Sequence, residues 1–523
     1  MFFKYFLIFI SILIIITLGK LTISLLNFNI GNFIYVFLDN LESFKLTFIV
    51  NTFVIILVVL ISYFISIYLF KKNNSTLLNL FIPYPHVSFA IGVFIFFTTS
   101  GIFERLLNIF NNNQLPRNDY LDNVELSILY IVSLTIREVP FLVITGISML
   151  NKINTSQIII LSRNLKISDD KAYLSIIFPL WLKNMIFPLL IIISFTYSNY
   201  EYSYIFGTQF PEFLNQIYLN EWSYNYFNNK NNVDILALII ILCLLLTVIF
   251  IYLIYIVLKK ILIFNVPINI NFKKIGKLFF YIINIFFIVN FIIMVLTSIS
   301  INWNFPNIIP NNLTLNHYTY ILTDNYELLA FSILISLLAS SLLTISLIYV
   351  HEMNQSKYKI TINSLLYSSF IILLIPQNIF LVELNSFFNF IVNDAYLLKY
   401  LISLLIYTVP YGLYLIQQTY NLPSTKNLRK HRENLKISKL RFFRNITIQQ
   451  LGFNFIFCFM VCFCVCFYQY LQAILITNGT LRLFNNEVMV LFNGESNYIA
   501  SAGAIINLMP CLILFILGLK KNV

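Results

Sequence analysis

The chain has 523 residues, of which 59% are hydrophobic and only 10% are charged. Soluble globular proteins carry roughly a quarter charged residues, so this composition excludes an ordinary soluble domain. It indicates an all-α polytopic membrane protein. The net charge of +12 would suggest nucleic-acid binding in a soluble protein, but in a membrane protein Lys and Arg gather in cytoplasmic loops. We therefore predict contact with membrane lipid and no contact with nucleic acid.

The apolar segments of the chain predict about twelve transmembrane helices. Crossing the hydrocarbon core takes about 20 apolar residues. The first apolar segment lacks a small-residue cleavage site, so we expect a retained helix rather than a removed signal peptide. The predicted spans lie near residues 2–25, 44–70, 78–98, 124–150, 181–200, 233–258, 278–298, 326–350, 361–383, 396–418, 451–475 and 498–518.

The distribution of charge predicts the orientation of these spans. An even number of spans puts both termini on one side of the membrane. With the termini in the cytoplasm, the cytoplasmic loops hold most of the 33 Lys and Arg and few of the 21 Asp and Glu. The opposite orientation would send Lys259-Lys260 and Lys273-Lys274 outside, against the positive-inside rule. We expect a multi-pass protein with both termini cytoplasmic.

A five-residue string, NLKIS, occurs twice. Its copies are Asn164, Leu165, Lys166, Ile167 and Ser168, and, 270 residues later, Asn434, Leu435, Lys436, Ile437 and Ser438. The same offset pairs Val139-Pro140 with Val409-Pro410, Ile176 with Ile446, and Tyr200 with Tyr470. Internal repeats of this kind are typical of transporters. We predict two repeated six-helix units, 1–265 and 266–523, joined through the basic segment 259–277.

Each copy of NLKIS falls in the longest cytoplasmic loop of its unit, 151–180 or 419–450. The first loop predicts two short helices separated by a turn at Ser168-Asp169-Asp170. Ser168 would cap the second helix, and Ser438 would have the same role. A basic, solvated loop would satisfy the positive-inside rule alone, but that rule does not require repeated Leu, Ile and Ser. The pattern therefore favours a short helix that docks onto a partner protein.

These loops resemble the cytoplasmic coupling loop of ABC-importer permeases, whose pattern is EAA, then Gly, then Ile-x-Leu-Pro. Aligning Pro179 with the terminal Pro puts Ile176 on the Ile, Phe178 on the Leu and Lys166 on the Gly, while the acidic start falls on Ile160. In the second copy Ile446 and Ile448 fit, whereas Lys436 replaces the Gly and Gln449 the Pro.

Longer segments resemble the double-length permeases of the thiamine transport system family. These segments are 82–105, 137–150, 469–479 and 486–494. The resemblance implies two fused permease units of the type I ABC importer kind in the bacterial inner membrane. It also implies an ABC ATPase dimer on the cytoplasmic side and a periplasmic substrate-binding protein. The solute moved inward would be small, such as thiamine or a related cation, although iron and polyamine importers share this architecture.

The chain lacks the phosphate-binding motif of ATPases, because Gly276-Lys277 is followed by Leu278. ATP would therefore be bound by the partner subunit, and we predict no cofactor, metal or catalytic residue here. One rival function is a twelve-helix secondary transporter driven by an ion gradient, for which Glu138 is the candidate coupling carboxylate. A second is a membrane-embedded enzyme, but no motif pairs any of the four His residues with an acid or nucleophile.

A few charged residues lie in or beside the apolar spans. Arg137 and Glu138 fall near the middle of the fourth span, where each charge costs roughly 2.5–3.5 kcal/mol. They form either a structural polar pair near Pro140 or part of a translocation path. Glu201 follows the fifth span, with Tyr200 before it. This group could accept a cation, although tyrosines also form belts at membrane interfaces.

The predicted orientation can be tested by cysteine labelling. A membrane-impermeant thiol reagent applied from the periplasmic side should not label Ser168→Cys or Ser438→Cys, because both positions are expected in the cytoplasm. The same reagent should label both variants after the membrane is permeabilised. Efficient labelling of intact spheroplasts would reverse the orientation.

Overall fold

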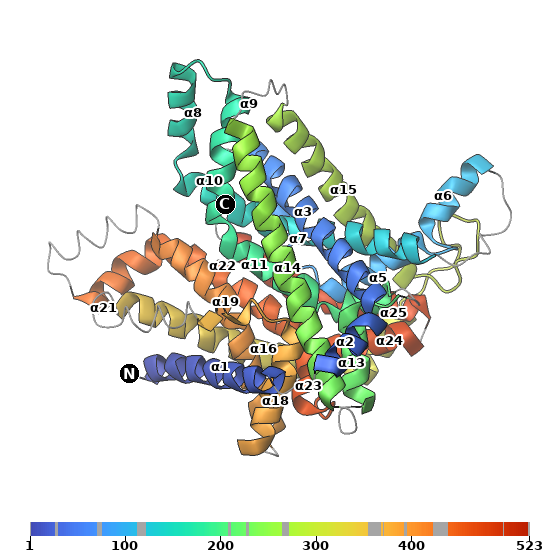
Figure 1. Cartoon of the computed structure of the whole chain (residues 1–523). Coiled ribbons are helices and arrows are strands. Elements are labelled where there is room, and N and C mark those ends of the chain that lie inside the picture. The colour runs from blue at the N-terminus through green and yellow to red at the C-terminus, as the bar shows by residue number, and fades with distance from the viewer. Residues whose placement is uncertain are drawn as a thin grey trace.

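Helices account for the regular structure of the computed structural model, which describes residues 2–26, 30–70, 76–111, 122–207, 211–225, 230–263, 271–353, 368–369, 371–391, 395–421, 438–494 and 496–520. Within these ranges there is no β-strand, only an isolated bridge between Ser300 and Leu313. Figure 1 shows the helices in chain order. Helices suit an apolar solvent because each backbone N–H and C=O finds its partner inside its own segment.

Up to residue 263 the chain forms fourteen α-helices and one π-helical segment, η1. They are α1 (Phe2–Leu26), α2 (Ile30–Asp39), α3 (Leu41–Leu69), α4 (Thr76–Asn79), α5 (His86–Phe97), α6 (Ile102–Asn111), α7 (Asn123–Lys152), α8 (Thr155–Asn164), α9 (Asp169–Ala172), η1 (Tyr173–Ile177), α10 (Phe178–Asn184), α11 (Ile186–Ser198), α12 (Tyr200–Ile205), α13 (Leu214–Asn225) and α14 (Lys230–Ile263).

From residue 272 onward a second series of helices follows, again with one π-helical segment, η2. They are α15 (Phe272–Ser298), α16 (Asn316–Met353), α18 (Gln377–Ile391), α19 (Tyr396–Asn421), α21 (Lys439–Phe442), η2 (Phe443–Thr447), α22 (Ile448–Phe467), α23 (Leu471–Thr477), α24 (Phe484–Gly494) and α25 (Asn497–Lys520).

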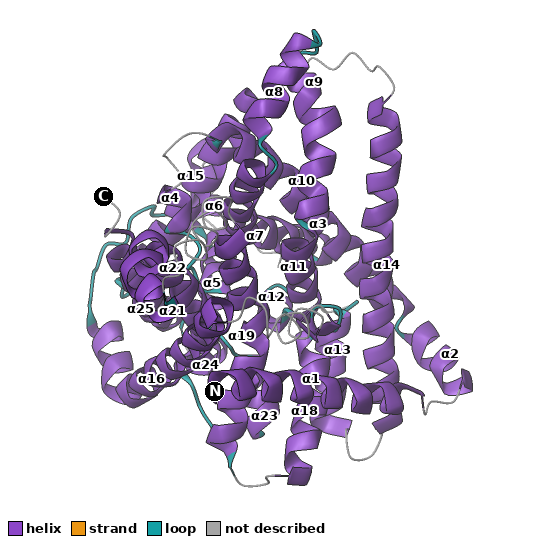
Figure 2. Ribbon diagram, turned by 90° about the vertical axis from the view of Figure 1, so that its left-hand side faces the viewer, coloured by secondary structure: helices purple, strands orange, loops and turns teal. Residues whose placement is uncertain are grey.

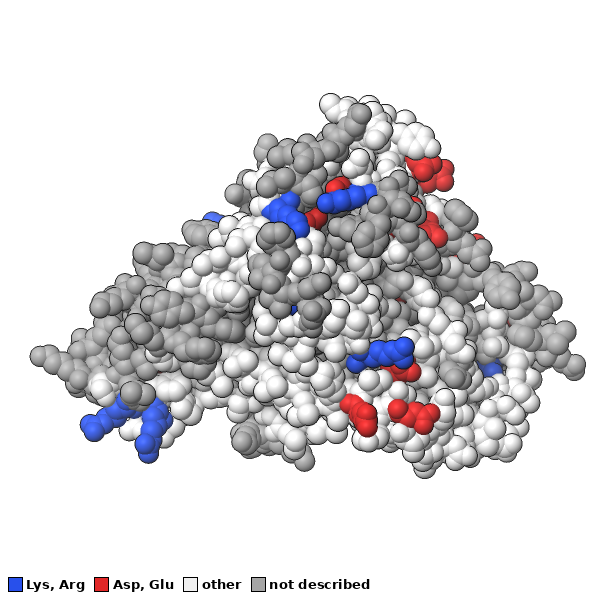
Figure 3. Space-filling model, turned by 90° about the horizontal axis from the view of Figure 1, so that it is seen from below, with Lys and Arg blue, Asp and Glu red and all other residues white. Residues whose placement is uncertain are grey.

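Nine helical segments among the described residues are long and apolar enough to cross a membrane, which makes the protein a multi-pass membrane protein. They are Leu41–Leu69, His86–Ile109, Val124–Lys152, Lys230–Val257, Phe272–Ser298, Asn316–Glu352, Tyr396–Tyr420, Phe443–Phe467 and Asn497–Gly518. The face drawn in Figure 3 agrees, since its described residues are mostly uncharged and the charges fall in a few separate groups.

One further pair of apolar helices is bent, as in a broken span or a re-entrant loop. Asp169–Asn184 and Ile186–Ile205 meet at an angle of 65°, which matches the predicted span near 181–200. Pro188 lies in the first turn of α11. It cannot donate a hydrogen bond to the preceding turn, and its ring crowds the carbonyl of residue 184, so the bend has a local cause.

Two of the predicted spans are not among these nine helices or the bent pair. The first, near 2–25, is covered by the 25-residue helix α1, whose side chains are described chiefly over Leu7–Lys20. The other, near 361–383, overlaps positions outside the described residues, and α18 begins only at Gln377.

Helices from distant parts of the sequence interlock. α15 packs against α3 and α5, while α1 packs against α16 and α18. The last helix, α25, lies between α15, α5 and α16. Figure 2 shows α1 crossing beside α18 at the base of the bundle. The first helix of each predicted unit therefore packs on helices of the other unit.

The contact between α15 and α3 depends on a glycine. A Cβ atom at Gly276 would lie 2.1 Å from the backbone oxygen of Phe64 and 2.9 Å from the Cβ of Tyr68. Small residues at helix interfaces let membrane helices approach this closely.

We expect Gly276→Ala to destabilise the protein by about 1–3 kcal/mol, because the added methyl group overpacks the interface. Gly452 in α22 is the matched control, since nothing lies within 4 Å of its Cβ position. Gly452→Ala should be neutral or stabilising by up to about 1 kcal/mol, the helix propensity difference. Thermal unfolding in detergent measures both, and equal melting temperatures would contradict the proposed close packing.

Candidate functional site

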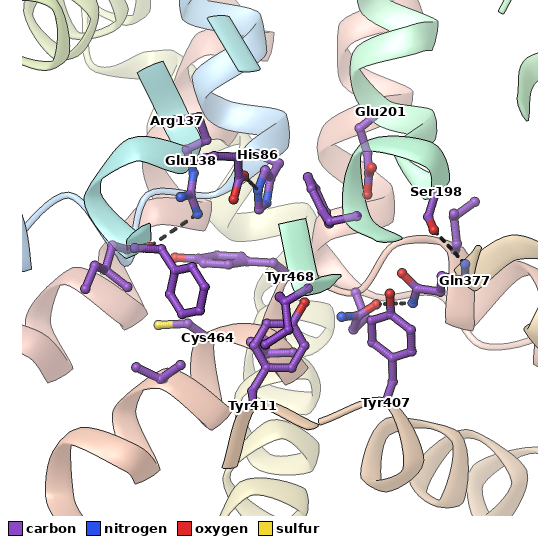
Figure 4. Close-up of a pocket in the computed structure, with 18 residues that line it drawn as sticks. His86, Arg137, Glu138, Ser198, Glu201, Gln377, Tyr407, Tyr411, Cys464 and Tyr468 are labelled. Carbon is purple, nitrogen blue, oxygen red and sulfur yellow. Dashed lines mark hydrogen bonds and ion pairs between the residues drawn. The ribbon is translucent and has the colours of Figure 1, made fainter. Parts of the chain in front are cut away.

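A polar cavity lies between α5, α7, α11 and α12 on one side and α18, α19, α22 and α23 on the other (Figure 4). The cavity has a volume of about 100 Å³. Ligand cavities in proteins span roughly 300–1,000 Å³, so this one suits only a small solute. The polar residues that line it are His86, Arg137, Glu138, Ser198, Glu201, Gln377, Tyr407, Tyr411, Cys464, Tyr468 and Gln469.

Breaks in the helices bring these side chains to the cavity. His86 is the first residue of α5 and follows Pro85, while Gln377 is the first residue of α18 and follows Pro376. Asn199 interrupts the chain between α11 and α12, and its side-chain oxygen accepts a hydrogen bond from the Tyr202 backbone N–H at 2.8 Å. Discontinuous helices near the midplane commonly form the solute sites of membrane transporters.

Glu138 is paired with a histidine. Its Oε1 lies 2.8 Å from Nε2 of His86, whose ring packs on Phe195 with centroids 4.1 Å apart. No ion pair joins Arg137 and Glu138 among the described residues, although both side chains are buried between helices. The histidine–acid pair was missed because the two residues are 52 positions apart and neither lies in a motif.

Arg137 is buried, with 6% of its surface exposed. One terminal nitrogen donates to the backbone oxygen of Ile82 at 3.3 Å, and its Nε has no hydrogen-bond partner among the described residues. A guanidinium group has five N–H donors, so this side chain is far from saturated.

Glu201 lies on the opposite side of the cavity in α12 and is 8% exposed. Its carboxylate makes no ion pair or hydrogen bond with any side chain in the described ranges. Among the tyrosines around it, Tyr202 is fully buried, whereas Tyr204 is partly exposed and accepts a hydrogen bond from Asn493 at 2.8 Å. Tyr200 packs on Tyr204, with ring centroids 5.4 Å apart, and on Tyr470, with centroids 6.0 Å apart.

The other side of the cavity is polar but uncharged. Gln377 donates from its side chain to Gln469 at 2.6 Å, and its backbone N–H donates to the Ser198 hydroxyl at 2.6 Å. The Tyr468 hydroxyl donates to the backbone oxygen of Pro83. The bonds to Ser198 and to Pro83 join the two sides of the cavity.

The first NLKIS copy forms the end of a helix that projects from the bundle (Figure 1). α8 ends at Asn164, and Lys166 adopts a left-handed backbone conformation with φ of 59°. The backbone N–H of Ile167 donates to the oxygen of Ser162, and that of Lys166 to the oxygen of Arg163, both at 2.9 Å. This pair of bonds is a Schellman motif, which usually has glycine at the left-handed position.

Two short helices with a turn between them are confirmed for this loop, but the turn spans 165–168 and not the predicted 168–170. Ser168 occupies the N-cap position of α9, yet its side chain forms no capping hydrogen bond. Arg163 instead bridges the turn through two bonds to the Asp169 carboxylate, at 2.8 and 2.6 Å. Leu165 is 72% exposed at the tip.

The second copy lies mostly outside the described residues, which resume at Ser438 after Asn434, Leu435, Lys436 and Ile437. Ser438 directly precedes α21, and its backbone oxygen accepts a hydrogen bond from the Phe442 N–H at 3.0 Å. The π-helical segment that follows, 443–447, stands 270 residues after the first one, 173–177.

Comparisons of the chain with protein-family models, with curated proteins and with solved structures find no match.

We expect the His86–Glu138 pair to stabilise the fold. Glu138→Leu leaves His86 without its acceptor and should cost about 1–3 kcal/mol or more. Glu138→Gln keeps a hydrogen-bonding side chain of the same shape and should cost less. Thermal unfolding in detergent gives the order of stability of the two variants and the wild type. Equal stability of the leucine variant and the wild type would contradict a stabilising role of the pair.

Proposed function

We propose that the protein is the fused permease subunit of an ABC importer, built from two repeated six-helix units in a bacterial inner membrane. It moves a small solute from the periplasm to the cytoplasm, with energy from a separate ATPase dimer and delivery by a periplasmic substrate-binding protein. The observation that carries the proposal is that residues 270 positions apart, the spacing of the two NLKIS copies, line the same cavity.

The cavity wall supports a repeat at an offset of 270. Six pairs of its lining residues differ by this number, so equivalent positions of the two units face the same space. The pairs are Arg137 with Tyr407, Phe141 with Tyr411, Ile191 with Val461, Phe195 with Val465, Ser198 with Tyr468, and Glu201 with Leu471.

Residues 270 positions apart, here called mates, would occupy equivalent places in the two units. Contacts between mates support a pseudo-two-fold axis through the cavity. The Ser148 hydroxyl donates to the side-chain oxygen of Gln418 at 3.0 Å, and these residues are 270 positions apart. Tyr200 and Tyr470, also mates, stack with their planes within 7°. A residue that touches its own mate lies beside the axis. Ser148 is near the end of α7 and Tyr200 at the start of α12, so the axis runs along the cavity between them.

The packing of the first helix of each predicted unit on helices of the other unit supports the same two-fold relation. α1 packs on α16 and α18, and α15 packs on α3 and α5, which is a reciprocal exchange if α15 is the mate of α1. An alternating-access site at the interface of two repeats is the usual arrangement in transporters.

The projecting loop supports the coupling role. Lys166, which aligns with the Gly of the importer pattern, has the left-handed backbone that glycine adopts most readily. Leu161 and Leu165 are 61% and 72% exposed, and exposed leucines beside a rigid turn suit a partner interface. We infer that NLKIS presents Leu165 and Ile167 to the ATPase, with Lys166 at the rim.

An ion-gradient-driven secondary transporter is the second candidate function. Two buried carboxylates, Glu138 and Glu201, line the cavity, and intramembrane carboxylates are the groups that couple ion movement to transport. The exposed coupling loop favours the importer, because a secondary transporter has no ATPase to bind.

The importer proposal is tested with Leu165→Asp. A charge at the centre of a desolvated interface should abolish copurification of the ATPase and transport, while membrane insertion stays normal. Leu313→Asp is the matched control, because Leu313 is 61% exposed in the connection before α16, on the predicted periplasmic side. Loss of the ATPase in both variants, or in neither, would contradict the docking role.

A further inference from the structure

The charges of the cavity all come from the first unit. Arg137, Glu138 and Glu201 line it, whereas the residues 270 positions later are Tyr407, Thr408 and Leu471. The second unit adds hydroxyl, amide and thiol groups but no charged side chain among the described lining residues. A solute that enters therefore meets fixed charges on one wall and neutral polar groups on the other.

Arg137 and Glu201 are the two charged residues of the cavity without a side-chain partner among the described residues. Glu138 already has His86 as its partner at 2.8 Å. Arg137 keeps one long bond to a carbonyl, at 3.3 Å, and Glu201 has no side-chain partner in the part of the chain that the structure describes. Both side chains are more than nine-tenths buried. A buried charge without a partner is strongly unfavourable, so each calls for a complementary group from the solute.

The two side chains occupy opposite sides of the cavity, and the rings of Tyr407, Tyr411 and Tyr468 lie between and below them (Figure 4). Aromatic faces together with a carboxylate suit an organic ammonium group. A guanidinium suits a carboxylate or another oxyanion. A simple cation would leave Arg137 unsatisfied and would be repelled by it, and a simple anion would meet the same difficulty at Glu201.

We propose that the cavity binds a small zwitterion, with its ammonium group at Glu201 and the tyrosine rings and its anionic group at Arg137. This assignment rests on the proposed role of the cavity as a transport site. It narrows the expected class of solute from an organic cation to a molecule that carries both charges.

The test uses matched compounds on the purified protein without its partners. Glycine betaine is compared with choline, which lacks the carboxylate, and with 3,3-dimethylbutyrate, in which carbon replaces the ammonium nitrogen. A longer set uses γ-butyrobetaine, 4-trimethylammoniobutanol and 5,5-dimethylhexanoate. The shift in melting temperature with concentration gives each Kd. In at least one set the zwitterion should bind about tenfold or more tightly than either analogue, because it makes one more charge-assisted contact.

Two variants test which residue binds each charged group of the zwitterion. Arg137→Gln should remove the advantage of the zwitterion over the cation, and Glu201→Gln should remove its advantage over the anion. Lys183→Gln, at an exposed position of α10, is the control and should change neither. Equal binding of zwitterion and cation to the wild type, preference for the anion, or no shift with any of the six compounds would overturn the proposal. A missing ATPase partner would refute the importer function but leave these shifts unchanged, so the two failures are distinguishable.

Discussion

The membrane requires charged side chains within its hydrocarbon layer to face protein, and the centre of this molecule is organised by that requirement. Arg137, Glu138 and Glu201 are between 6% and 8% exposed, on helices whose other faces carry apolar residues suited to lipid. Turning these charges inward obliges α7 and α12 to pack against helices that supply polar groups. α19, the start of α18 and the connection after α22 do so with tyrosine hydroxyls and glutamine amides. The polar cavity is thus a consequence of where the charges lie in the sequence.

Much of this fold follows from the sequence because the length of an apolar run is a local property. Ten predicted spans match helices or the broken pair in the structure. The bend at Met185 was not predicted, since a helix break leaves hydropathy unchanged, although Pro188 was a usable signal. The turn after α8 was placed three residues too late because Lys166 carries no sign of its left-handed backbone. Glycine at that position would have indicated it.

The candidate site was predicted only in part. Arg137, Glu138 and Glu201 were chosen because charge is conspicuous in an apolar segment, and all three line the cavity. His86 was set aside because no motif linked it to an acid. One signal could have found the pair: a glutamate in the middle of a span needs a partner, and His86 follows Pro85 within another predicted span. Which helices face each other is a long-range property, so the tyrosines and glutamines of the opposite wall could not be assigned from one sequence.

The hydrogen bond between Ser148 and Gln418 bears on how a protein with two fused units, as proposed here, can evolve. In a dimer of identical subunits, any side chain beside the dyad meets a copy of itself. An arginine or glutamate placed there would appear twice, and like charges would face each other in a medium that screens them poorly. In the fused two-unit chain proposed above, each position can diverge from its mate, which removes that restriction. The serine and glutamine form a donor–acceptor pair that self-pairing would not give. The same freedom lets the central chamber be electrically polarised across its width.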